Sequence, residues 1–144
     1  MIHFASIESF RKRLNELLEV KRGVYGGVKD EICKEFRSST IEQIRQNRDM
    51  ILISNDSIVV KLRLPDKKQR LSKADGYRLI YMVMKQVPLV IFLDIYPKRG
   101  PKQQLDIEDN EINNLISDFI IENESNTIIL HDINNGLAEI FVQK

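Results

Sequence analysis

Two apolar runs, residues 77–84 and 89–96, are rich in β-branched and aromatic side chains and are separated by four residues. Such runs are typical of neighbouring antiparallel strands inside a sheet. Residues 85–87 are expected to turn the chain between them. Pro88 suits the first position of the second strand, because no ladder hydrogen bond is lost there. A β-hairpin over residues 76–96 is therefore the prediction that most constrains the fold.

Apolar residues at helical spacing flank this hairpin on both sides. Ser6 is a residue type that caps helices, and the first helix is expected to follow it and to end before the glycines at 23, 26 and 27. Asp106 is expected to open the last helix. The predicted helices cover about residues 7–20, 28–36, 40–47 and 107–121.

Two further hairpins are expected. Residues 50–64, MILISNDSIVVKLRL, hold two β-rich runs separated by Asn55-Asp56, and Asn135-Gly136 is the turn expected within residues 127–144. Helices followed by a meander of antiparallel strands indicate an α+β fold. The 144 residues are expected to form a single domain, with a core over residues 1–122 and a C-terminal extension over residues 123–144.

Strand alternation predicts which polar side chains share a surface. Successive side chains point to opposite faces of a sheet, so the odd-numbered residues of 59–63 and the even-numbered residues of 78–82 and 92–98 would face one way if the strands pair in register. The other faces stay apolar enough to pack on helices. The expected face contains Lys61, Arg63, Arg78, Phe92, Asp94, Tyr96 and Lys98, with Lys73, Arg99 and Lys102 beside it.

The net charge of +1 conceals a strong division along the chain. Residues 61–102 contain 11 Lys/Arg and 3 Asp/Glu, a balance of +8. Residues 103–144 contain 1 Lys/Arg and 9 Asp/Glu, a balance of −8. A strand-forming segment with this positive excess is a candidate surface for a polyanion, and the alternative is an ordinary solvated face.

Clustered cations bind phosphates and stabilise the charge that develops on a phosphoryl group in a transition state. Neighbouring positive charge also favours the ionised form of a tyrosine, so Tyr96 is a candidate proton acceptor or base-stacking residue. Two structural alternatives stay open. Tyr96 could be a half-buried strand aromatic, and Arg78 could form a structural bridge with Asp94.

Other kinds of site have little support in the sequence. His3 and His131 are near opposite ends of the chain, and no spacing of His, Cys, Asp and Glu matches a known ligand motif, so no metal or cofactor is expected. The longest apolar run, residues 87–93, is too short to cross a bilayer. With a single cysteine, Cys33, and no apolar stretch at residues 1–13, the chain is expected to be cytoplasmic.

The segments KLRLPDKKQRLSKADGYRLIYMV (residues 61–83) and VIFLDIYPKRGPKQQLDIEDNEI (residues 90–112) resemble the RelE/HigB-like toxins of bacterial type II toxin–antitoxin systems. In that family a strand of the form yKlRl leads into a basic loop, a Gly-Gly-Tyr-Arg strand, a strand ending in aromatic-x-Lys, and a short acidic helix. The resemblance extends over about residues 8–116. Two departures are Asp75-Gly76 in place of Gly-Gly and the hairpin after residue 122.

The resemblance implies N-terminal helices packed on a mostly antiparallel twisted sheet, a short C-terminal helix, and an extra hairpin in this chain. It also implies metal-independent cleavage of mRNA on the ribosome, by attack of the RNA 2′-hydroxyl, and a protein antitoxin as partner. By position, Arg63 and Arg78 would contact the scissile phosphate, Tyr96 would be the general base, and Lys98 or Lys73 would stabilise the leaving oxygen. The RNA-binding residues would be Lys61, Lys67, Lys68, Arg70, Arg99 and Lys102.

Alternative functions stay open at this point. A ParE-like member of the same superfamily would inhibit DNA gyrase without cleaving RNA, and a silent member would only bind RNA or a partner. The basic excess of residues 61–102 favours RNA. The acidic residues 103–144 would either moderate RNA access to the basic face or cover a strand at the sheet edge.

Overall fold

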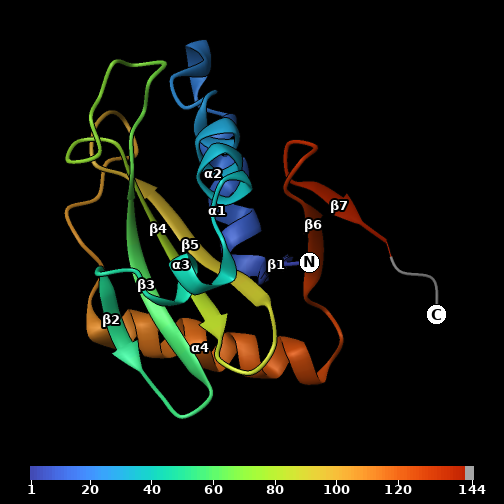
Figure 1. Ribbon diagram of the computed structural model, residues 1–144. Coiled ribbons are helices and arrows are strands. Elements are labelled where there is room, and N and C mark those ends of the chain that lie inside the picture. The colour runs from blue at the N-terminus through green and yellow to red at the C-terminus, as the bar shows by residue number, and fades with distance from the viewer. Residues whose placement is uncertain (142–144) are drawn as a thin grey trace.

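A computed structural model describes residues 1–141. Over this range the chain is an α+β protein built on a seven-stranded, mostly antiparallel sheet (Figure 1). The strands lie in the order β2-β3-β4-β5-β1-β6-β7. Their bounds are β1 His3–Ser6, β2 Met50–Ile53, β3 Ser57–Leu64, β4 Tyr77–Met84, β5 Leu89–Pro97, β6 Ile129–Asp132 and β7 Ala138–Ile140.

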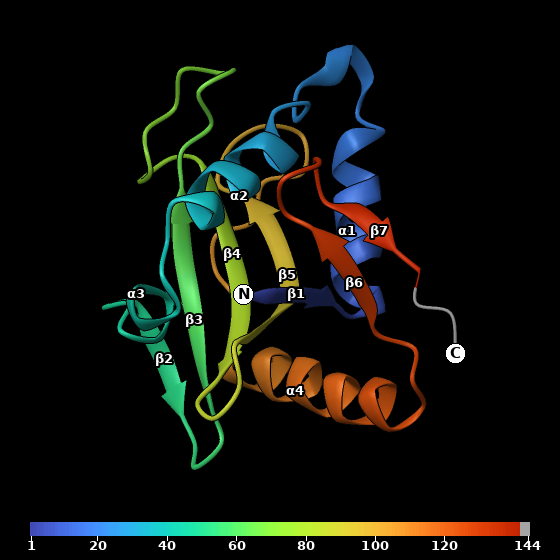
Figure 2. The same ribbon diagram turned by 45° about the vertical axis from the view of Figure 1, so that its right-hand side comes forward.

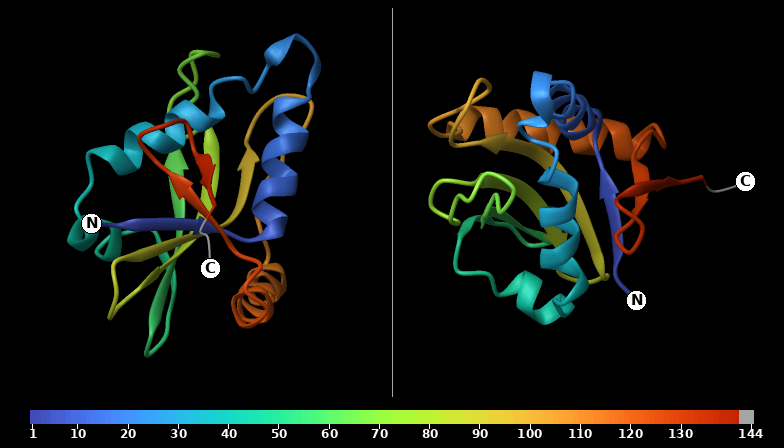
Figure 3. Two further views of the ribbon diagram at one scale, coloured as in Figure 1. Left: turned by 90° about the vertical axis from the view of Figure 1, so that its right-hand side faces the viewer. Right: turned by 90° about the horizontal axis from the view of Figure 1, so that it is seen from above.

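Helices cover both faces of the sheet, and β5 passes between α2 and α4 in the right-hand view of Figure 3. The described residues contain α1 Glu8–Leu18, a 3-10 turn at Lys21–Gly23, α2 Val28–Arg37, α3 Ile41–Arg45 and α4 Asp109–Glu124. None of the helices within residues 1–141 has the length and apolar character needed to traverse a membrane.

The two faces of the sheet bury separate apolar clusters. On the side of α1 and α2, the Phe92 ring stacks on Phe4 and Phe10 with centroids 5.9 and 5.2 Å away, and Phe36 packs against it at 5.5 Å. On the side of α4, Phe119 joins a cluster of residues from the central strands. The strands are apolar on both faces because both are covered, which explains their near-continuous hydrophobic runs.

The expectation that helices come first was wrong, because His3–Ser6 form a strand before α1. This strand is parallel to β5 and antiparallel to β6, so it lies inside the sheet (Figure 2). Ser6 is therefore the last residue of β1, and Ile7 occupies the position before α1 without a side-chain cap. Likewise, α4 begins at Asp109, with Glu108 and not Asp106 at its N-cap.

The predicted C-terminal hairpin is confirmed, with Gly136 in its turn at φ +58°. A buried contact attaches it to the sheet: the Ser6 Oγ is 2.6 Å from His131 Nε2, and His131 Nδ1 is 2.9 Å from the Leu137 oxygen. Strand β6 pairs with β1, which would otherwise form the edge of the sheet. The hairpin therefore covers an edge strand, as one of the two sequence-based alternatives proposed.

Gly76 is required where β4 begins beside the end of β3. A Cβ atom at this position would lie 2.1 Å from the Leu64 oxygen and 2.8 Å from the Pro65 carbonyl carbon. These are backbone atoms, which move only if the strand pairing shifts. The glycine thus permits the close approach of two chain segments.

We therefore expect Gly76→Ala to lower the free energy of unfolding by about 1–3 kcal/mol, the usual range for forcing extra atoms into packed structure. Urea denaturation followed by circular dichroism measures this. Gly26→Ala is the control, because the closest atom to its added Cβ is the terminal Nζ of the flexible Lys68 side chain. Equal stability of the two variants would contradict the required close approach at Gly76.

Candidate nucleic-acid interface

The strand registers bring the predicted polar residues together. Arg63 of β3 lies directly opposite Arg78 of β4, which in turn lies opposite Tyr96 of β5. One step along, Lys61 and Asp94 lie on either side of Ile80. Directly opposite residues in an antiparallel pair point to the same face. The expected convergence of these side chains across three strands is therefore confirmed.

Phe92 was expected on the same face, and this was wrong. The pairing of β4 with β5 shifts between Ile80 and Tyr81, so Ile80 pairs with Asp94 while Tyr81 pairs with Phe92, and Leu93 has no partner of its own. Such a bulge reverses the alternation on either side of it. Phe92 consequently packs against the rings of α1 and α2, while Tyr96 packs on the side of α4.

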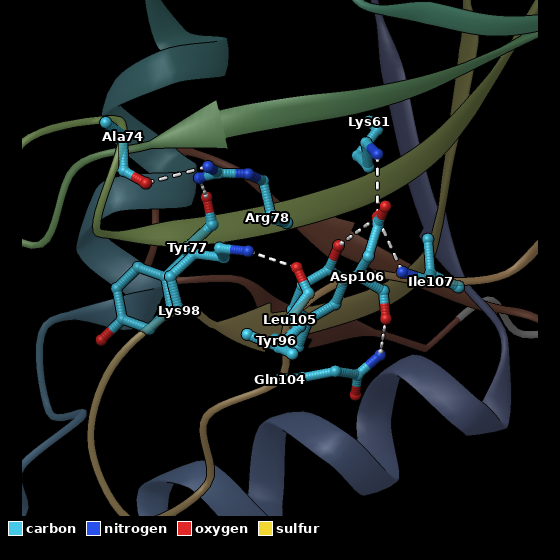
Figure 4. Close-up of polar contacts among 10 residues, drawn as sticks. All are labelled: Lys61, Ala74, Tyr77, Arg78, Tyr96, Lys98, Gln104, Leu105, Asp106 and Ile107. Carbon is cyan, nitrogen blue, oxygen red and sulfur yellow. Dashed lines mark hydrogen bonds and ion pairs between the residues drawn. The ribbon is translucent and has the colours of Figure 1, made fainter.

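Arg78 is held by the loop that precedes β4. The residue is only 9% exposed, and its guanidinium donates to the backbone oxygen of Lys73 at 2.8 Å. It also donates to the backbone oxygens of Ala74 and Tyr77 at 2.9 and 3.2 Å (Figure 4). Burial, and next the neighbouring Arg63, lower the pKa of Arg78. Asp94 pairs instead with Arg13 of α1, at 3.7 Å, so the proposed bridge between Arg78 and Asp94 is absent from the described residues.

Tyr96 does not have the environment that the sequence suggested. Its side chain is buried, and its hydroxyl donates to Asp106 Oδ1 across 3.5 Å. Burial, followed by the charge of Asp106, raises the pKa of Tyr96, although Arg78 acts in the opposite direction. The expectation that nearby cations would favour the phenolate was wrong, because loss of hydration outweighs their attraction.

Three other candidate cations already have partners nearby. Lys61 Nζ donates to Asp106 Oδ1 at 2.9 Å, and Lys98 donates to the backbone oxygen of Leu105 (Figure 4). Arg99 forms an ion pair with Asp75 at 2.6 Å. The segment between β5 and α4 therefore lies against the cationic face and neutralises part of it.

Arg63 and Lys73 are exposed and line one groove of about 640 Å³. Within residues 1–141, Arg63 makes no ion pair. The other residues of this groove were not predicted, because they lie in a helix, in a loop without a recognisable motif and, for Leu62, on the apolar face of β3. They are Glu35, Asn47, Arg48, Asp49 and Leu62. Among these residues, only the positive charge of Arg48, just before β2, could have indicated from the sequence that it belongs to a phosphate-binding groove.

The remaining predicted RNA-binding residues are exposed but lie elsewhere. Lys68 Nζ donates to the Gly23 oxygen at 3.2 Å, and the Lys67 amide donates to Glu31 at 2.7 Å, so this part of the basic loop lies against the turn before α2. The Lys102 amide donates to the Tyr25 hydroxyl at 3.1 Å. Arg70 is exposed, with φ +59°. None of these four residues lines the groove of Arg63 and Lys73.

Among residues 1–141, no three His, Cys, Asp or Glu side chains are grouped so that they could hold a metal ion. Comparisons of the chain with protein-family models, with curated proteins and with solved structures give no match. Fold and site thus define an α+β protein with a groove, lined by three cations and two carboxylates, beside a three-strand polar face.

We expect Arg78→Ala to destabilise the protein by on the order of 2–4 kcal/mol, because three backbone oxygens would lose a charged donor. Arg63→Ala should change stability by less than about 0.5 kcal/mol, since this side chain is exposed. Chemical denaturation of both variants tests the contrast. If Arg78→Ala were as stable as Arg63→Ala, the structural role of Arg78 would be refuted.

Burial raises the pKa of all four tyrosines, which are Tyr25, Tyr77, Tyr81 and Tyr96. An alkaline titration followed by phenolate absorbance should therefore show no ionisation in the folded protein near about pH 10, the ordinary value. The unfolded chain loses these protons there, so stability is complete below that pH and falls as pH rises above it. A signal below about pH 9 that disappears in Tyr96→Phe would instead restore Tyr96 as a base.

Proposed function

We propose that this chain is a RelE/HigB-like toxin that cleaves mRNA without a metal ion, by attack of the RNA 2′-hydroxyl on the adjacent phosphate. The observation that carries the proposal is the alignment of Arg63, Arg78 and Tyr96 across adjacent strands, next to the groove that also contains Lys73. This alignment agrees with the residues that suggested the family. Messenger RNA on the ribosome and a cognate antitoxin, in the cytoplasm, are the partners that the proposal implies.

The exposed cations of the groove are the best placed to hold phosphate. Arg63, Lys73 and Arg48 line it together, and a guanidinium can make two parallel hydrogen bonds to phosphate oxygens. Charge that grows on the phosphate during attack would be stabilised by the same groups. Lys98 stays a candidate for the leaving oxygen only if it leaves the Leu105 oxygen.

The proton acceptor is better assigned to the groove than to Tyr96. Glu35 and Asp49 both line the groove, whereas the Tyr96 side chain is buried and its pKa is raised. A general base must reach the 2′-hydroxyl within hydrogen-bonding distance, so access decides first and pKa second. In this scheme neither Arg78 nor Tyr96 performs the chemistry. Arg78 holds the backbone of Lys73, a residue of the groove, and Tyr96 lies opposite Arg78 on the neighbouring strand.

A silent RNA-binding module is the second candidate. The backbone contacts of Arg78 and the neutralisation of Lys61 by Asp106 both favour it, because they remove two charges from catalytic use. A ParE-like gyrase inhibitor has no specific observation in its favour and stays an outcome of the test.

Expression in bacteria, with primer-extension mapping of cellular mRNA, tests the proposal. We expect growth arrest with codon-phased cuts, and Arg63→Ala should reduce cleavage by roughly 10²–10³-fold, as for the loss of one electrostatic stabiliser. Cleavage of free RNA by purified protein, where it occurs, should continue in EDTA. Lys12→Ala is the charge-matched control, because this exposed lysine belongs to α1 and not to the groove.

The outcomes separate the candidates. RNA binding without cuts would favour the silent module. Growth arrest with intact mRNA and inhibited DNA supercoiling would favour a gyrase inhibitor. Cuts that are unaffected by Arg63→Ala would contradict the assignment of the groove as the active site.

A further inference from the structure

The Asp106 carboxylate lies among donors that suit a phosphate. Its Oδ1 accepts hydrogen bonds from Lys61 Nζ at 2.9 Å and from the Ile107 amide at 2.8 Å, and the Tyr96 hydroxyl points to it from 3.5 Å (Figure 4). An ammonium group, a backbone amide and a phenol hydroxyl are the kinds of donor that proteins present to phosphate oxygens. Here a carboxylate of the same chain occupies them.

Polar contacts hold this carboxylate in place. Lys98 donates to the backbone oxygen of Leu105. The backbone N–H of Gln104 donates to the Pro97 oxygen at 2.9 Å, and its side-chain Nε2 donates to the backbone oxygen of Asp106 at 2.9 Å. We call residues 104–106 the strap. The strap contacts two cations of the polar face, Lys61 on β3 and Lys98 just after β5. It also lies next to the side chain of Tyr96.

The strap has little apolar anchoring. Leu105 is 83% exposed, and the Asp106 side chain is 65% exposed, so lifting residues 105 and 106 would uncover little hydrophobic surface. An exposed ion pair contributes little net stability and weakens in salt. Ile107, by contrast, is buried in the cluster under α4 and marks where the firm structure resumes.

We propose that the strap is an autoinhibitory element in which Asp106 occupies, in cis, the position of an RNA phosphate. This inference rests on the proposed function, since it takes RNA as the ligand of the polar face that adjoins the groove of Arg63 and Lys73. An incoming phosphate displaces the Asp106 carboxylate from Lys61 and the Ile107 amide and thereby also releases Lys98. The acidic segment 103–144 thus restrains the basic segment 61–102 through one carboxylate.

Asp106→Asn tests the inference, because it removes the charge and keeps the size of the side chain. Asp109→Asn is the matched control: Asp109 is exposed, begins α4, and makes no ion pair within residues 1–141. Both variants change the net charge equally. Binding of a labelled single-stranded RNA is measured by fluorescence anisotropy at several salt concentrations, after thermal melts show that both variants are folded.

We expect Asp106→Asn to bind RNA about 10-fold tighter than the unaltered chain, with a salt dependence steeper by about one phosphate contact. Asp109→Asn should behave like the unaltered chain. Adding Lys61→Ala to Asp106→Asn should remove most of the gain, because the released lysine supplies the new contact.

Several results would overturn the inference. An equal gain in both single variants would show that net charge alone matters. RNA binding by the unaltered chain that Asp106→Asn leaves unchanged or weakens would refute the strap while leaving the proposed function intact. No RNA binding by any of the proteins would refute the inference, and the mapping of cellular mRNA described above would then decide the proposed function separately.

Discussion

The antiparallel pairing of β3, β4 and β5 is the constraint on which the rest of the molecule depends. Eight consecutive pairs join β3 to β4, and every residue of β4 from Tyr77 to Val83 is buried. A one-residue slip would exchange the two faces of β4 and move its side chains from one buried cluster to the other, so packing fixes the register strongly. Since the register is fixed by the core, the positions of Arg63, Arg78 and Tyr96 at its polar end are fixed as well.

Strand β1 determines what the C-terminal extension can do. It lies between β5 and β6 in the sheet. The hairpin of β6 and β7 is therefore on one side of β5, and β3 and β4 are on the other, as Figure 2 shows. The hairpin is therefore not the acidic element that would moderate RNA access to the basic face. Acidic groups do reach that face, but they are Asp106 and Asp75, which contact Lys61 and Arg99.

Much of this arrangement could be predicted because period-two alternation and turn residues are local signals. The hairpins at residues 50–64 and 76–97 and the shared polar face follow from them. The four residues of β1 are too few to show a period, and their strand forms only because β5 and β6 supply partners. The bulge at Leu93 also leaves no signal in the sequence, because it depends on how the side chains of β4 and β5 pack on both faces of the sheet.

The burial of individual side chains was the property of the site that could least be predicted from the sequence. Coulomb attraction from Arg78 and desolvation act on the Tyr96 phenol in opposite directions, and only the structure shows that desolvation is larger. The same burial makes Arg78 bond to backbone oxygens, since an enclosed guanidinium must satisfy its donors within the protein. Residues deep in a sheet can thus hold a site in shape, while chemistry on a polyanion requires charges that water and substrate can reach. Arg63 and Lys73 meet that requirement, and the groove they share with Arg48 is where an RNA phosphate would be bound.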